Sequence, residues 1–136
     1  SLRSDRAMMV RSVMEGVALN VRWLFGYYEK FLKRRVPTVR ILGGGAQSDL
    51  WCSIIASTLD RNVEQVADPL NAQLRGVALW TRVCAGELTL QQAAATVPVA
   101  RTFTPDPADR QVYAQHFAEY PKLYGSLKGF YRRINA

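Results

Sequence analysis

Three consecutive glycines between a short β-branched run and a helix start constrain the fold of this chain more than any other feature. Residues 38–42 are bounded by Pro37 and glycine, which predicts a short buried strand. Gly43-Gly44-Gly45-Ala46 follows at once, and Ser48 or Asp49 is suited to cap the helix that comes next. A strand, a glycine turn and a capped helix in this order predict an α/β layer.

Helices and strands alternate along the rest of the chain. Ser4 or Asp5 caps a long amphipathic helix that Pro37 stops. After the glycine segment and its helix we expect a strand at 62–66 and a helix from Asn71 to Gly86. A short helix then starts with a capping box at Thr89, and an extended segment follows at 99–104. The last helix is capped by Asp106, and Pro121 kinks or splits it. Strands that alternate with helices predict a short parallel sheet.

Length and composition indicate one globular domain. The chain has 136 residues, of which 49% are hydrophobic and 21% charged, values typical of a globular chain rather than a disordered one. No apolar run is long enough to span a membrane. The chain has only two cysteines, Cys52 and Cys84, which excludes a disulfide scaffold and a zinc ribbon. Its single histidine, His116, excludes any mechanism that needs two histidines. We therefore expect a cytoplasmic protein.

The two short strands and the first residue suggest a part of a larger protein. The chain opens at Ser1 without a methionine and enters the first helix almost at once. Two short strands make a poor sheet alone, so we expect the first strands of the sheet to be encoded before Ser1.

The glycine segment is the strongest candidate for a site. Glycine lets a ligand approach the backbone closely, and the free N–H groups at the start of the next helix favour an anion or a polar sugar. A nucleotide phosphate or ribose fits this arrangement, and so does a tight turn that binds nothing. The segment is neither a GxGxxG motif nor a Walker A loop.

The remaining polar residues suggest no catalytic or metal site. The acidic residues form no close pair in sequence, so none is nominated as a general base. Cys52 and Cys84 are expected in the core, and His116 has no second metal ligand nearby. Trp51 is expected in the core rather than against an adenine, and Glu15 is expected to have a structural role.

The chain carries a formal net charge of +7, and its basic residues cluster at 30–35 and 122–133 among aromatic side chains. This pattern is compatible with nucleic-acid binding, but we favour a solvated basic face because no nucleic-acid-binding motif accompanies it. The alternative hypothesis is a stand-alone basic α/β module that binds nucleic acid or a partner protein.

Four stretches, taken in order, resemble the C-terminal domain of the FGGY carbohydrate kinases, nearest to the xylulokinase-like branch. They cover that domain's first long helix at residues 11–18, its glycine-rich nucleotide loop and next helix at 40–51, the following turn and helix at 68–79, and its closing segment at 103–124. The stretch GGGA-x-S-x-x-W within residues 40–51 is the most specific piece.

The resemblance implies that residues 1–136 are a C-terminal, nucleotide-side fragment of a two-domain kinase with the actin-like ATPase (ribonuclease H-like) fold. It implies ATP-dependent phosphoryl transfer to a hydroxyl of a sugar or polyol, most like xylulose. Gly43-Gly44-Gly45-Ala46 would lie against the nucleotide, and Ser48 and Asp49 would contribute from the helix start.

The same resemblance implies what lies outside the chain. The family's catalytic Asp, its phosphate-binding hairpin and most of its sugar contacts belong to the N-terminal domain, so this chain is expected to hold no catalytic or metal-ligating residue. ATP and Mg²⁺ would be bound mainly with that domain, which is the expected partner, and a homodimer is compatible with the pattern. The fragment alone is expected to be inactive.

Two positions depart from the family pattern. Gln73-Leu74-Arg75 stands where small or apolar residues are usual, and Arg75 would either reach the nucleotide or be solvated. Asp49 stands where some relatives carry Asn. An ionised Asp beside phosphates is unfavourable unless it faces ribose or magnesium.

Overall fold

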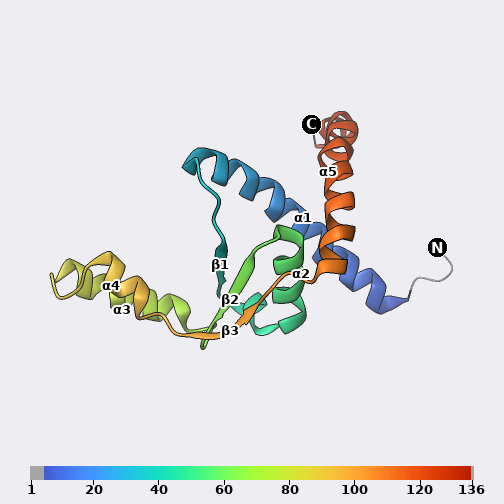
Figure 1. The fold of residues 1–136 in the computed structure, drawn as a ribbon. Coiled ribbons are helices and arrows are strands. Elements are labelled where there is room, and N and C mark those ends of the chain that lie inside the picture. Colours follow the sequence, from blue (N-terminus) through green and yellow to red (C-terminus); the bar gives the residue numbers. More distant parts are fainter. Residues whose placement is uncertain (1–4, 136) are drawn as a thin grey trace.

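The computed structural model describes residues 5–135, and its elements follow nearly the predicted order (Figure 1). They are α1 (Arg6–Leu32), β1 (Thr38–Ile41), the 3₁₀ helix η1 (Gly44–Gln47), α2 (Asp49–Leu59), β2 (Asn62–Val66), α3 (Ala72–Cys84), α4 (Leu90–Ala95), β3 (Val99–Phe103) and α5 (Pro107–Ile134). Asp5 caps α1 by accepting a hydrogen bond from the Met8 N–H at 2.7 Å. The alternative cap, Ser4, lies outside the described residues.

The sheet is mixed and has the strand order β1-β2-β3. β1 and β2 pair in parallel, with Val39 opposite Val63, as predicted. β3 pairs antiparallel to β2, so the prediction of a purely parallel sheet is wrong. The reason is the connection: α3 and α4 form a hairpin whose two ends meet through a hydrogen bond from the Ala67 N–H to the Pro98 carbonyl at 2.9 Å. The chain therefore re-enters the sheet at the end where it left, and runs back along β2.

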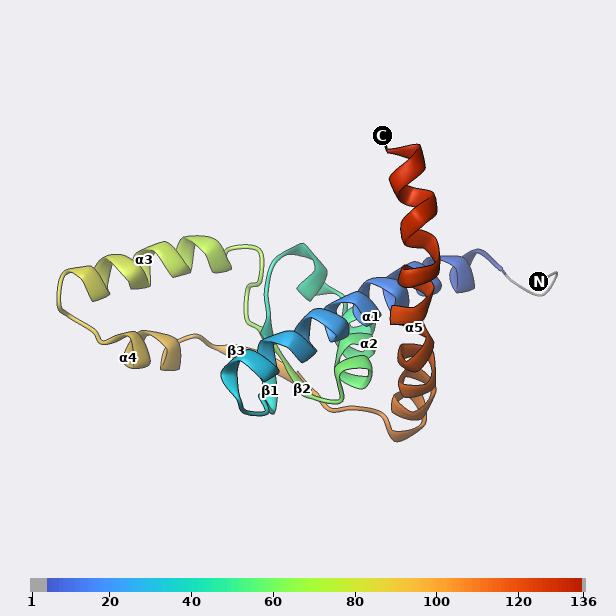
Figure 2. The same cartoon turned by 90° about the horizontal axis from the view of Figure 1, so that it is seen from above.

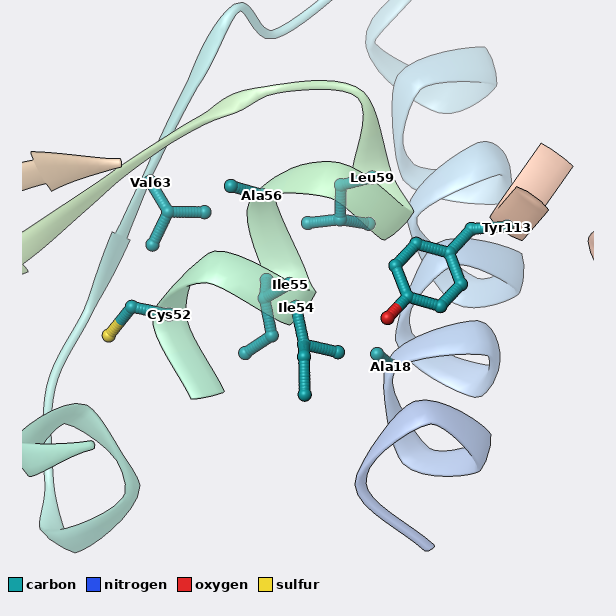
Figure 3. Packing of buried hydrophobic residues seen from close by; sticks show 8 residues of the cluster. All are labelled: Ala18, Cys52, Ile54, Ile55, Ala56, Leu59, Val63 and Tyr113. Atoms are coloured by element: carbon teal, nitrogen blue, oxygen red, sulfur yellow. The ribbon is translucent and has the colours of Figure 1, made fainter. Parts of the chain in front are cut away.

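The hydrophobic core lies on both sides of α2. One side of α2 packs against the sheet and the other against α1 and α5. Figure 3 shows Val63 of β2 on the first side and Ala18 of α1 with Tyr113 of α5 on the second. The buried cluster comprises Ala18, Cys52, Ile54, Ile55, Ala56, Leu59, Val63 and Tyr113. α2 is thus held in place by all its neighbours, which fixes its first turn beside the glycine segment.

The α3–α4 hairpin projects from the rest of the molecule (Figure 1 and Figure 2). α3 has no buried residue, and its apolar Leu74 and Val77 are 71% and 67% exposed. Cys84 at the end of α3 is exposed, so its predicted place in the core is wrong because nothing packs over that helix end. The predicted capping box of α4 is present: Thr89 accepts from the Gln92 N–H, and the Gln92 side chain accepts from the Thr89 N–H.

α5 begins as predicted and bends at its interior proline. The Asp106 carboxylate accepts hydrogen bonds from the N–H groups of Ala108 and Asp109, with Pro107 in the first turn. Figure 1 and Figure 2 together show that the axis of α5 changes direction between its two halves. Pro121 lies inside the helix and supplies no N–H, which accounts for the bend. Within the described residues, no helix is long and apolar enough to cross a membrane.

Candidate functional site

The glycine segment leaves the carboxyl end of β1 and winds into η1 before α2 begins. Gly43 has a φ of 86°, a left-handed conformation that favours glycine. Its N–H donates to the Pro69 carbonyl at 2.9 Å, which ties the segment to the turn after β2. The Ala46 N–H donates back to the Gly43 carbonyl at 3.1 Å, so the segment is a defined turn that closes on itself.

The three glycines have different structural reasons to be glycine. Position 43 requires glycine because its φ is positive, a conformation that other residues rarely adopt. A Cβ on Gly45 would lie 3.1 Å from Nε1 of Trp51, closer than ordinary contact, so Gly45 makes room for the indole. A Cβ on Gly44 would meet nothing within 4 Å, and its φ is not in the left-handed region. The chain's own packing therefore does not demand glycine at 44, whereas a ligand on the backbone would.

Several backbone N–H groups in and after this segment have no hydrogen-bond acceptor among the described residues. Among the hydrogen bonds of residues 5–135, none uses the N–H of Gly44 or Gly45 as a donor. The first turn of α2 likewise leaves the N–H of Asp49 without an intrahelical acceptor, as every helix start does. Ser48 is the N-cap, and its hydroxyl accepts from the Trp51 N–H at 3.2 Å. These donors lie within residues 44–49 and suit a ligand rich in oxygen acceptors.

Trp51 and Cys52, in the first turns of α2, lie against the glycine segment. Trp51 is partly buried against the hydrophobic core, in line with the prediction that it is a core residue. The Cys52 thiol lies 3.8 Å from the Ala46 carbonyl. Burial, together with the negative charge of Asp49, raises the pKa of the Cys52 thiol, so the thiol stays protonated at neutral pH and serves packing rather than nucleophilic chemistry.

Two strand residues that sequence reasoning missed complete the site. Gln65 of β2 donates through Nε2 to the Ala46 carbonyl at 2.6 Å and to the Asp49 carboxylate at 3.3 Å. Arg101 of β3 forms an ion pair with the other carboxylate oxygen of Asp49. Arg101 also lies over the ring of Phe103, with its Cζ atom 4.8 Å from the ring centroid. The only signal in the sequence was the polar character of the 62–66 strand.

Other residues singled out in the sequence lie away from this site or serve structure. Arg75 is partly buried and donates to the Ala67 carbonyl at 3.0 Å, so it holds the turn after β2. Glu15 accepts hydrogen bonds from Arg11 and from the buried Tyr113, which joins α1 to α5. Across residues 5–135, no three His, Cys, Asp or Glu side chains gather as metal ligands.

The chain is similar to known carbohydrate kinases in sequence and in structure. Residues 1–113 match the model of the FGGY family of carbohydrate kinases, C-terminal domain. A curated relative, L-xylulose/3-keto-L-gulonate kinase of Escherichia coli (strain K12), is 32% identical over 135 residues, which are 95% of this chain and 26% of the relative.

Two solved structures extend the comparison to the fold. Xylulose kinase from Rhodospirillum rubrum matches with a TM-score of 0.77 and 28% identity over 97% of this chain and 27% of its own. A kinase from Brucella ovis described as a xyloylose kinase matches with a TM-score of 0.79 and 23% identity over 96% of this chain and 27% of its own, a likeness of fold alone. The chain thus spans about a quarter of the length of these relatives. Its match over most of its length to one family model shows that the chain belongs to the FGGY family of carbohydrate kinases, whose C-terminal domain it represents.

Proposed function

We propose that this chain is the nucleotide-side part of an ATP-dependent carbohydrate kinase, which transfers a phosphoryl group from ATP to a hydroxyl of a sugar or polyol. The observation that carries the proposal is the family match over residues 1–113, which includes the glycine segment. In the whole protein, the mixed sheet and its helices belong to a domain of the actin-like ATPase (ribonuclease H-like) fold. The protein acts in the cytoplasm, where ATP is supplied.

The glycine segment has the properties that a nucleotide needs. The unused N–H groups of Gly44 and Gly45 suit phosphate or ribose oxygens, and the open space at Gly44 leaves room for the ligand to touch the backbone. We assign Gly43-Gly44-Gly45-Ala46 to contact with the nucleotide. Ser48 orients the start of α2, and Asp49 contributes at the same helix start.

Phosphoryl transfer also needs a base for the attacking hydroxyl and Mg²⁺ to neutralise the phosphates. Among the described residues no three His, Cys, Asp or Glu side chains gather, and Mg²⁺ at kinase sites is held by the nucleotide phosphates with only one or two carboxylates. We place the catalytic Asp, the Mg²⁺ contacts and most sugar contacts in the N-terminal domain of the whole protein. That domain is the chain's principal partner, and the 136-residue chain alone is inactive.

The substrate class follows from the relatives. The curated relative acts on L-xylulose and 3-keto-L-gulonate, and the Rhodospirillum rubrum structure is of a xylulose kinase. We therefore propose a ketopentose-like substrate. D-xylulose and L-xylulose are the first sugars to test, with ATP consumption as the readout.

Gly44→Val in the intact protein tests the loop assignment. A Cβ at position 44 meets no protein atom within 4 Å and the residue is exposed, so we expect the fold to tolerate valine there. The valine side chain would occupy the space where the nucleotide would touch the backbone. We expect the KM for ATP to rise by about tenfold or more, equivalent to about 1.4 kcal/mol, with an unchanged unfolding midpoint.

Gly125→Val is the matched control. A Cβ on Gly125 in α5 also meets nothing within 4 Å, and this position is far from the glycine segment in the chain. The control should leave the KM for ATP unchanged. Equal KM values for the wild type and Gly44→Val would contradict the loop assignment.

A further inference from the structure

The start of α2 carries a charge that a nucleotide site would not be expected to carry. Asp49 is the first residue of α2 and lies three positions after Ala46, the last residue of the glycine segment. Its side chain is 56% exposed, so its negative charge acts on a ligand that binds at the glycine segment. Two like charges roughly 8 Å apart in an intermediate dielectric change a binding constant by about fivefold. Asp49 alone would therefore weaken binding of a phosphate-bearing ligand.

The strands place a compensating cation against this carboxylate. Gln65 and Arg101 are direct partners in the antiparallel pairing of β2 and β3, so their side chains lie on the same face of the sheet. Both reach Asp49, Gln65 with its amide and Arg101 with its guanidinium. The guanidinium also lies over the ring of Phe103, two residues further along β3. Arg101 is thus held at the start of α2 by neighbours on its own strand and across from it.

The same group of side chains is joined to the glycine segment itself. The Gln65 amide that contacts Asp49 also donates to the Ala46 carbonyl at 2.6 Å. The ion pair and the last residue of the glycine segment therefore share one hydrogen-bonding side chain. A surface ion pair elsewhere on the chain, such as Arg82 with Glu87 on the projecting hairpin, has no such connection.

We infer that Arg101 and Asp49 act as a charge-compensating pair in nucleotide binding. Arg101 cancels the repulsion between Asp49 and the nucleotide phosphates, and Asp49 positions the guanidinium beside the glycine segment. The inference rests on the proposed function, because it needs a nucleotide at that segment. It assigns a role in the site to a β3 residue, and it explains how Asp49 is tolerated there.

The test measures binding of Mg·ADP to the intact protein by isothermal titration calorimetry, which needs no knowledge of the sugar. Arg101→Gln should weaken ADP binding by about fivefold, and Asp49→Asn should bind at least as tightly as the wild type. The double variant Asp49→Asn/Arg101→Gln should return to within about twofold of the wild type. Arg101→Lys should retain most of the affinity, and the Arg101→Gln effect should shrink at high salt.

Arg82→Gln is the matched control, since it breaks an exposed ion pair of the same chemistry away from the site, and it should leave ADP binding unchanged. A wild type that binds no ADP would overturn the proposed function and the inference together. A wild type that binds ADP, with Arg101→Gln binding equally well, would overturn the inference alone. An Arg101→Gln loss of the same size in the Asp49→Asn background would also overturn it, because compensation predicts rescue.

Discussion

At the scale of single residues, Glu29 shows how one carboxylate joins separate parts of the chain. It lies on α1 and accepts a hydrogen bond from the Val36 N–H at 2.7 Å. Its two oxygens also accept from Arg61, which follows α2, at 2.8 to 3.2 Å. Burial opposes ionisation of Glu29, but the Val36 N–H and the Arg61 guanidinium outweigh burial and lower the pKa of the carboxyl.

Glu29→Gln should lower the free energy of unfolding by about 2 kcal/mol at pH 7, because it weakens charge-assisted hydrogen bonds in a partly buried place. Since the folded pKa lies below the unfolded one, this stabilisation is complete above pH of about 5 and is lost as the pH falls through the folded pKa. Urea unfolding at pH 7 and at pH 3 measures the difference.

Glu87→Gln is the control for this prediction, because Glu87 pairs with Arg82 where both side chains are more than half exposed. It should change the free energy of unfolding by less than about 0.5 kcal/mol. A Glu29→Gln effect that does not shrink at low pH would show that the ionised carboxylate is not the source of the stabilisation.

The sequence alone could predict the residues of the site that are neighbours in the chain. Gly43 to Asp49 form one continuous stretch, and the helix-capping role of Ser48 follows from local chemistry. Gln65 and Arg101 could not be predicted, because only strand pairing brings them to Asp49. Gln65 is a polar residue in the predicted strand at 62–66, and nothing in the sequence indicates that its amide binds the glycine segment.

At the scale of elements, the α3–α4 hairpin differs from the rest of the chain. Its helices follow the predicted order and α4 has the predicted capping box. Yet α3 buries no residue, whereas α2 buries seven of its eleven. The hairpin therefore contributes little to the packing that holds the sheet and α2 together.

Leu74→Ala in α3 should change the free energy of unfolding of the 136-residue chain by less than about 0.5 kcal/mol, because its side chain is 71% exposed. Ile54→Ala in α2 should cost about 2–5 kcal/mol, because Ile54 is 1% exposed in the core. Chemical denaturation of the two variants makes the comparison. Equal losses would mean that α3 packs against the core.

Element boundaries were easier to predict than element placement. Asp106, Pro107 and Thr89 act through local hydrogen bonds and backbone geometry, so their effects are visible in sequence. The direction of β3 was mispredicted because it depends on where the hairpin leaves and re-enters the sheet. Likewise, the apolar residues of α3 recur at helical spacing, which predicts a helix with one apolar face. The spacing does not show whether other residues of the same chain pack against that face.

At the scale of the whole molecule, α2 packs against the sheet and the two long helices α1 and α5. The glycine segment joins β1 to α2 and is held in place by that packing. The predicted α/β class is correct, and membership of the FGGY family is shown by the match over residues 1–113. The chain spans about a quarter of the length of its relatives. It was expected to hold no catalytic base because the resemblance assigns the family's catalytic Asp to the N-terminal domain. Its proposed contribution is a nucleotide contact, made with the backbone.

A crystal structure of the intact protein with Mg·ADP is the most direct test of that contribution. The proposed contact predicts a phosphate or ribose oxygen of ADP within about 3 Å of the N–H of Gly44 or Gly45. It also predicts that the Asp49–Arg101 ion pair persists beside the nucleotide. ADP bound elsewhere, with no contact to residues 43–49, would show that the glycine segment does not bind the nucleotide.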